Sequence, residues 1–177
     1  MKVVVTGPPG IGKTTLVRKL VDRLGDRAVG FWTEEVRDPE SRKRTGFVVV
    51  TTDGRRVLFA SKTFTSKYLV GSYGVNLQRF ESAVLPVLRK ALEAKGDRVV
   101  VIDEVGKMEL FSKRFRELVG RIVHDPRLNL VVTIPIRDVH PLVREIRRLP
   151  SAVLIELTRS NREGMVEEVI GLLSGDL

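Results

Sequence analysis

Short β-branched runs alternate along the chain with longer segments in which apolar residues recur every three or four positions. The short runs are typical of buried strands, and the longer segments of amphipathic helices. Because the two kinds of segment alternate, the pattern predicts a parallel α/β sheet with helices on both faces. Strands are predicted at residues 2–6, 29–37, 98–102, 129–134 and 152–157, and helices at residues 13–24, 76–95, 113–123, 139–148 and 161–173.

An antiparallel addition is predicted between the second strand and the longest helix. Residues 46–52 and 55–60 are predicted as two strands joined by Asp53-Gly54, a dipeptide that favours tight hairpin turns. Residues 61–74 hold several Ser, Thr and Gly residues and are predicted to form an irregular loop. No repeat or linker interrupts the pattern, so we expect residues 1–177 to form a single domain.

The segment between the first strand and the first helix carries a specific chemical motif. Residues 7–14 are Gly-Pro-Pro-Gly-Ile-Gly-Lys-Thr, which fits the phosphate-binding loop (P-loop) pattern of Gly, four residues, Gly, Lys and Ser or Thr. Glycines let backbone N–H groups curl toward phosphate oxygens, and the following helix adds its positive end. Lys13 is expected to reach the β- and γ-phosphates, and the Thr14 hydroxyl to bind Mg²⁺. The predicted nucleotide-binding residues here are Gly7, Pro8, Pro9, Gly10, Ile11, Gly12, Lys13, Thr14 and Thr15.

A short motif of this kind also occurs by chance in loops rich in Gly and Pro. Here it follows a predicted buried strand and opens a predicted helix, and this context favours the phosphate-binding interpretation.

Two acidic residues follow the buried strand that ends at Ile102. Asp103 is predicted to hold Mg²⁺, mainly through water, and Glu104, on the other side of the pleat, to activate the attacking water as general base. A solvated acidic turn is the alternative. The pair favours the water-activating branch of P-loop proteins, in which an extra strand, here residues 129–134, lies between the first strand and the strand before Asp103. Thr133, at the end of that strand, is either a sensor of the γ-phosphate or an ordinary strand-end hydroxyl.

Residues 103–112, Asp-Glu-Val-Gly-Lys-Met-Glu-Leu-Phe-Ser, resemble the extended acidic motif of a small nucleoside-triphosphatase family. That family occurs in thermophilic bacteria and archaea and includes the animal cancer-related nucleoside-triphosphatase. The turn Asp38–Arg44 is longer than is usual in the family, which leaves the role of this loop open. Further similar stretches are residues 30–37, 44–47, 73–76, 140–143 and 158–162, so that the resemblance covers nearly the whole chain.

The resemblance implies a P-loop NTPase fold of three αβα layers, with a mostly parallel sheet and an added antiparallel hairpin. It implies Mg²⁺-dependent release of the γ-phosphate from ATP, GTP, CTP, UTP and TTP with little base preference. It also implies nucleotide binding by residues 7–14 and 99–106. The second stretch consists of Val99, Val100, Val101, Ile102, Asp103, Glu104, Val105 and Gly106.

Several basic residues are further candidates. Lys107 could stabilise charge on the transferring phosphoryl group like an internal arginine finger, or it is an ordinary loop lysine. Arg37 and Arg44 flank a turn and could close over the phosphates, or remain solvated. At the start of the last predicted helix, Arg162 could stack on any base through its planar group, and Asn161 could contact the nucleotide or only cap the helix.

Three functions remain open, and the net charge of +9 motivates the third of them. The first is hydrolysis of a nucleoside triphosphate. The second is a small kinase that passes the phosphoryl group to a nucleoside, a nucleotide or RNA, and the third is an ATPase stimulated by nucleic acid. Hydrolysis is favoured, because the acidic pair suits water activation and the basic residues are scattered with no aromatic ladder among them.

Composition limits the remaining possibilities. The absence of Cys excludes disulfides and zinc sites built on thiolates. No run of about 18 apolar residues and no signal peptide is visible, so we expect a cytoplasmic protein with no membrane span. No predicted element is unusually apolar on its outer side, which favours a monomer. The chain has one Gln and three Asn, a scarcity of thermolabile residues that suggests a thermophilic source.

Overall fold

The computed structural model describes residues 1–175. The strands are β1 (Lys2–Gly7), β2 (Ala28–Arg37), β3 (Arg44–Thr51), β4 (Arg56–Ser61), β5 (Leu69–Val70), β6 (Tyr73–Val75), β7 (Val99–Ile102), β8 (Asn129–Pro135) and β9 (Ala152–Glu156). The α-helices are α1 (Lys13–Leu24), α2 (Leu77–Ala91), α3 (Lys113–His124), α4 (Pro141–Arg147) and α5 (Met165–Ser174), and short 3₁₀ turns lie at 25–27, 109–111 and 162–164.

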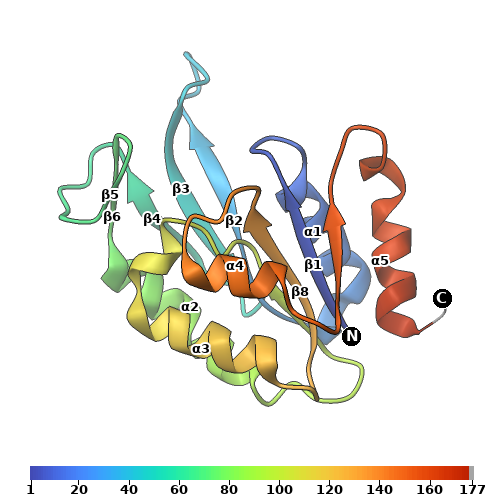
Figure 1. Cartoon of the computed structure of the whole chain (residues 1–177). Coiled ribbons are helices and arrows are strands. Elements are labelled where there is room, and N and C mark those ends of the chain that lie inside the picture. The colour runs from blue at the N-terminus through green and yellow to red at the C-terminus, as the bar shows by residue number, and fades with distance from the viewer. Residues whose placement is uncertain (176–177) are drawn as a thin grey trace.

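Within residues 1–175 the strands form one sheet in the order β5-β6-β4-β3-β2-β7-β8-β1-β9 (Figure 1). Strands β2, β7, β8, β1 and β9 pair in parallel. The position of β8 between β7 and β1 confirms the predicted extra strand, which is typical of the water-activating branch.

The antiparallel part of the sheet is larger than the single predicted hairpin. Strand β3 pairs antiparallel with both β2 and β4, and β6 then joins β4 to β5. Residues 61–74, predicted as an irregular loop, contain β5 and most of β6. Strands of two and three residues are too short to show the period-2 alternation that identifies strands in a sequence.

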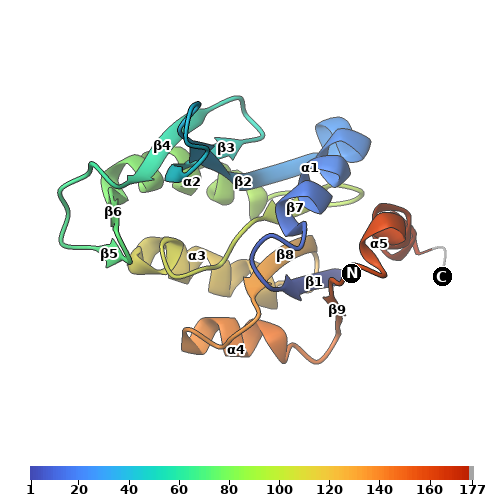
Figure 2. The same ribbon diagram turned by 90° about the horizontal axis from the view of Figure 1, so that it is seen from above.

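Helices cover both faces of the sheet, as predicted. Helices α2, α3 and α4 pack on one face and α1 and α5 on the other (Figures 1 and 2). Along β1 the side chains alternate accordingly: Val3 and Val5 face α1 and α5, whereas Val4 faces the opposite layer. Burial on both faces explains the run of three valines, Val3–Val5, in this strand. The three-layer P-loop fold is therefore confirmed.

Helix boundaries mostly follow their predicted chemistry. The Asn76 side chain accepts a 3.0 Å hydrogen bond from the Arg79 N–H and caps α2, as expected. The last helix differs, because a 3₁₀ turn over residues 162–164 precedes α5, which begins at Met165. Among residues 1–175, no helix is both long and apolar enough to cross a membrane.

Candidate active site

The phosphate loop connects the end of β1 to the start of α1. Gly10 and Gly12 have φ values of +80° and +114°, which side chains with a Cβ rarely adopt, so glycines are needed here. No side chain caps the N-terminus of α1. The first N–H groups of a helix have no partner within the helix, so these donors can serve an anion.

Lys13 lies across the mouth of this loop. Its ammonium donates a 2.8 Å hydrogen bond to the carbonyl of Gly7 and lies 2.9 Å from the Glu104 carboxylate. Both side chains are mostly buried, with 12% and 26% of their surface exposed. A charge pair in such a setting is screened less by salt than a surface pair.

Asp103 accepts hydrogen bonds from two hydroxyl groups. Thr14 donates to Oδ2 over 2.8 Å, and Thr133 donates to Oδ1 over 2.6 Å. Asp103 is 1% exposed, and this burial, together with the charge of Glu104, raises its pKa to about 6 although both hydroxyl bonds act in the opposite direction.

Thr14 and Asp103 are therefore adjacent, as the sequence predicts for a shared Mg²⁺ site. Among residues 1–175, no group of three or more His, Cys, Asp or Glu side chains is arranged to hold a metal. Two oxygen donors nevertheless fit Mg²⁺, which commonly takes one or two protein ligands and completes its shell with water and substrate phosphate.

Thr133 is fully buried and does not line the cavity at the site. Its hydroxyl is committed to Asp103. The structure thus places it behind the acidic residue, a role that was not part of either sequence interpretation, a sensor of the γ-phosphate or an ordinary strand-end hydroxyl.

A second buried carboxyl group lies beside Glu104. The Gly106 N–H donates a 2.9 Å hydrogen bond to Oε1 of Glu109, which is 6% exposed. Burial raises the pKa of Glu109 to about 8, and the charge of Glu104 adds to this effect. A Cβ atom on Gly106 would lie 2.9 Å from carboxyl oxygens of both Glu104 and Glu109, so a larger residue here would require these carboxyl groups to move.

Sequence reasoning missed Glu109 as a residue of this site. The only available indication was its place in the 103–112 motif, where an acid stands directly before the apolar pair Leu110-Phe111.

These groups surround a cavity of about 720 Å³ at the carboxyl ends of β1, β2 and β7. This is the edge at which parallel α/β sheets bind ligands. Of the predicted nucleotide-binding residues, those that line it are Pro9, Gly10, Gly12, Lys13, Thr14, Thr15, Asp103, Glu104 and Gly106. Asp103 and Glu104 both line this cavity, so the prediction that they lie on opposite sides of the pleat is wrong.

Other predicted residues lie behind this lining. The side chains of Val99, Val100, Val101 and Ile102 are buried in the two hydrophobic layers. They position the acids at the end of the strand and do not line the cavity. Val105 is also buried, and Gly7, Pro8 and Ile11 belong to the loop without lining the cavity.

Among the basic candidates, Lys107, Arg37 and Arg44 are exposed residues that line the cavity. Arg162 does not line it, but its guanidinium donates a 3.2 Å hydrogen bond to the Ile11 carbonyl of the phosphate loop. The Asn161 side chain accepts from the Thr158 N–H over 2.7 Å, so it stabilises the loop after β9 and caps no α-helix.

Comparison with known proteins agrees with this geometry. The NTPase family profile matches residues 2–170. The chain is 65% identical to the nucleoside-triphosphatase THEP1 of Aquifex aeolicus, covering 98% of this chain and 99% of that protein. It is 40% identical to the human cancer-related nucleoside-triphosphatase, covering 95% of this chain and 94% of that protein.

Solved structures of these two proteins share the fold. The crystal structure of the Aquifex aeolicus THEP1 superposes with a TM-score of 0.93 at 60% identity, covering 98% of this chain and 99% of that one. The solution structure of the human nucleoside-triphosphatase superposes with a TM-score of 0.82 at 38% identity, covering 99% and 98%. The phosphate loop, the acidic pair and the agreement over nearly the whole length show that this chain is an enzyme of the nucleoside-triphosphatase (NTPase) family.

Proposed function

We propose that this enzyme hydrolyses the γ-phosphate of ATP, GTP, CTP, UTP and TTP in a Mg²⁺-dependent reaction with low base selectivity. The observation that carries the proposal is the convergence of Lys13, Thr14, Asp103 and Glu104 on one cavity. Phosphoryl transfer needs little covalent help from a protein, so positioning and electrostatic stabilisation by such groups account for most of the catalysis.

The loop glycines and Lys13 would bind the polyphosphate. Backbone N–H groups at the start of α1 would face the bound anion, and the Lys13 ammonium lies beside the loop, 2.8 Å from the Gly7 carbonyl. Thr14 and Asp103 would hold Mg²⁺ through oxygen atoms that already lie 2.8 Å apart. When bound, the ion neutralises negative charge that develops on the phosphate oxygens.

Glu104 would act as the general base. Its carboxylate lines the cavity beside Lys13, and it would accept the proton of the attacking water. Lys107 lines the same cavity, and among residues 1–175 it forms no salt bridge, so its charge is available to the γ-phosphate.

Low base selectivity follows from where these contacts lie. The cavity-lining groups named above would bind phosphates and the metal ion, which all five triphosphates share. Arg162, held against the loop at Ile11, would contact the base by stacking, an interaction that every base can accept.

The test is a phosphate-release assay with each triphosphate, with and without Mg²⁺, in the presence and absence of RNA, DNA and hydroxyl acceptors. We expect free phosphate from all five substrates at similar kcat/KM, only with Mg²⁺, and no stimulation by nucleic acid. Transfer of labelled phosphate to an acceptor instead of water would show a kinase, and strong stimulation by RNA would show a nucleic-acid-dependent ATPase.

A further inference from the structure

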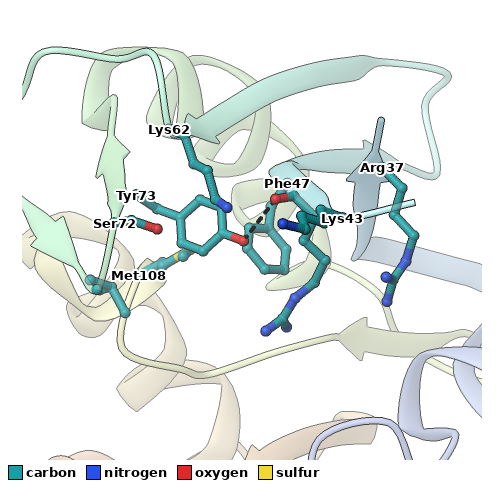
Figure 3. A pocket seen from close by; sticks show the side chains of 10 residues that line it. Arg37, Lys43, Phe47, Lys62, Ser72, Tyr73 and Met108 are labelled. Carbon is teal, nitrogen blue, oxygen red and sulfur yellow. Dashed lines mark hydrogen bonds between the residues drawn. The ribbon is translucent and has the colours of Figure 1, made fainter. Parts of the chain in front are cut away.

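A second cavity of about 540 Å³ adjoins the first one. Its walls come from the β2–β3 hairpin, the end of β4, the β5–β6 hairpin and the loop after β7 (Figure 3). The two cavities share the lining residues Arg37, Arg44, Phe47, Val70 and Met108. A ligand in the second cavity would therefore lie beside a nucleotide in the first, separated from it by shared side chains.

The lining of the second cavity is strongly basic. It contains Arg37, Arg44, Lys43 and Lys62, and among residues 1–175 no acidic side chain lines it. Glu35, just outside, lies 2.6 Å from the guanidinium of Arg37 and 3.3 Å from that of Arg44. One carboxylate thus holds two arginines in place and leaves a net positive charge, which favours an anionic ligand.

The two lysines of this cavity, unlike the two arginines, have no carboxylate partner among residues 1–175. Neither Lys43 nor Lys62 forms a salt bridge within the part of the chain that the structure describes. The Lys62 ammonium lies 5.7 Å from the centroid of the Tyr73 ring. Both side chains are exposed and can turn toward a bound phosphate, since lysine acts as a flexible point charge.

An aromatic pair forms the apolar part of the wall. The rings of Phe47 and Tyr73 are 5.2 Å apart at 71°, an edge-to-face contact that fixes both (Figure 3). The Tyr73 hydroxyl donates a 3.4 Å hydrogen bond to the Arg44 carbonyl and ties the ring to the hairpin. A rigid ring beside free cations suits a ligand that joins an aromatic group to a phosphate.

We propose that this second cavity binds a nucleoside monophosphate while a triphosphate occupies the phosphate loop. The phosphate would lie toward Arg37 and Arg44, which face both cavities, and the base would lie against Tyr73. The volume falls within the range of small-ligand sites, roughly 300–1,000 Å³. This proposal goes beyond triphosphate hydrolysis but rests on the proposed binding of a triphosphate at the phosphate loop, and the Lys13→Ala variant described below separates the two.

The test is calorimetric titration of AMP, GMP, CMP and UMP into protein saturated with Mg²⁺ and a non-hydrolysable triphosphate. We expect binding at least about tenfold tighter than that of inorganic phosphate or of the unphosphorylated nucleoside, since each supplies only half of the contacts. The double variant Lys43→Ala/Lys62→Ala should weaken monophosphate binding about tenfold or more, and Lys62→Arg should retain it.

Lys67 provides a matched control. Its ammonium lies 5.3 Å from the centroid of the Tyr68 ring, so it has the same kind of neighbour as Lys62, but it does not line the cavity. Lys67→Ala should leave monophosphate affinity unchanged. The Lys13→Ala variant, tested without triphosphate, should still bind monophosphate, which separates this site from the phosphate loop.

Equal loss of affinity in the Lys67 variant and the double variant would overturn the proposal. So would equal affinity for inorganic phosphate and the monophosphates, or loss of monophosphate binding in Lys13→Ala. A 5′-phosphorylated single-stranded RNA is titrated in parallel. Binding of that RNA with no binding of free monophosphates would also overturn the proposal and would identify a surface for nucleic acid.

Discussion

The Lys13 ammonium lies 2.9 Å from the Glu104 carboxylate, so one ion pair joins the cation that we assign to phosphate binding and the base that we assign to water activation. A triphosphate at the loop would compete with Glu104 for Lys13, because its oxygens carry more negative charge. Release of Glu104 from this pair would free it to accept a proton. Under this proposal, substrate binding and activation of the base would be coupled through a single lysine.

The Glu104→Gln variant tests this coupling. Nucleotide affinity should be unchanged or several-fold tighter, because the competing charge on Lys13 is gone. Turnover should fall by roughly 10²–10⁴-fold, the usual contribution of a general base. Binding of a fluorescent non-hydrolysable analogue and steady-state phosphate release measure the two quantities.

Glu167→Gln is the control for this variant, since Glu167 is exposed and pairs with Arg23 outside the cavity. It should alter neither quantity. Full turnover in Glu104→Gln would show that another group activates the water.

Replacement of Lys13 by Ala should abolish tight triphosphate binding. The variant loses a charge-assisted contact made by a side chain that is only 12% exposed. We expect Kd to rise about 100-fold or more, which corresponds to roughly 3 kcal/mol. Isothermal titration with a non-hydrolysable triphosphate measures this change. Lys19→Ala, an exposed position on the same helix, is the matched control, and equal affinity in both variants would refute the assignment of the loop.

Thr133→Val tests the hydrogen bond that the Thr133 hydroxyl donates to Asp103. The substitution keeps the shape of the side chain but removes the donor of the 2.6 Å hydrogen bond to a carboxylate that is 1% exposed. A buried acceptor that loses its partner costs about 1–3 kcal/mol, so the melting temperature should fall.

The proposed Mg²⁺ site provides a second measurement for the same variant. Half-maximal activity should require several-fold more Mg²⁺ in Thr133→Val, because Asp103 is held less firmly. Thr133→Ser keeps the hydroxyl and should restore the Mg²⁺ requirement. If Thr133→Val changed stability alone, the hydroxyl would have a structural function only.

Several parts of the fold and of the candidate site could be predicted from short stretches of the sequence. The phosphate loop lies between β1 and α1, and the acidic pair follows β7, because both features depend on residues that are neighbours in the sequence. The position of β8 between β7 and β1 could be predicted from the acidic pair, because this pair is typical of the water-activating branch of P-loop proteins. These predictions needed only local chemistry and the rule that parallel strands present their carboxyl ends at one edge.

What the sequence did not indicate depends on contacts between distant segments. The bond from Thr133 to Asp103 joins residues 30 positions apart, and no local pattern specifies it. Nothing in the local sequence distinguishes Glu109 from other acidic residues, and only the fold buries it beside Glu104. The second cavity likewise requires the β2–β3 and β5–β6 hairpins to meet, and the latter was too short to be detected.

The raised pKa of Glu109 predicts a specific dependence of stability on pH. Burial, reinforced by the charge of Glu104, raises this pKa from 4.5 to about 8. Between these values the unfolded chain has lost the proton while the folded chain retains it. The free energy of unfolding should therefore fall as pH rises from about 4.5 to 8 and should level off above that.

Glu109→Gln should remove this part of the pH dependence. The amide oxygen can still accept the Gly106 N–H, and the side chain stays neutral at every pH. Relative to the original protein, the variant should gain stability between pH 5 and pH 9, by an amount on the order of a few kcal/mol. Asp103 adds its own pH dependence in a lower range, up to about pH 6, and this part is common to both proteins.

Urea unfolding of both proteins at pH 5, 7 and 9 measures the difference. Glu117→Gln, at an exposed position on α3, removes the same charge from the surface and should shift stability equally at all three values. A parallel offset for Glu109→Gln as well would mean that Glu109 is ionised in the folded chain at neutral pH. An ionised Glu109 would add a second negative charge next to Glu104 and raise the affinity of the cavity for cations. With a neutral Glu109, the negative charge of Glu104 is balanced by Lys13.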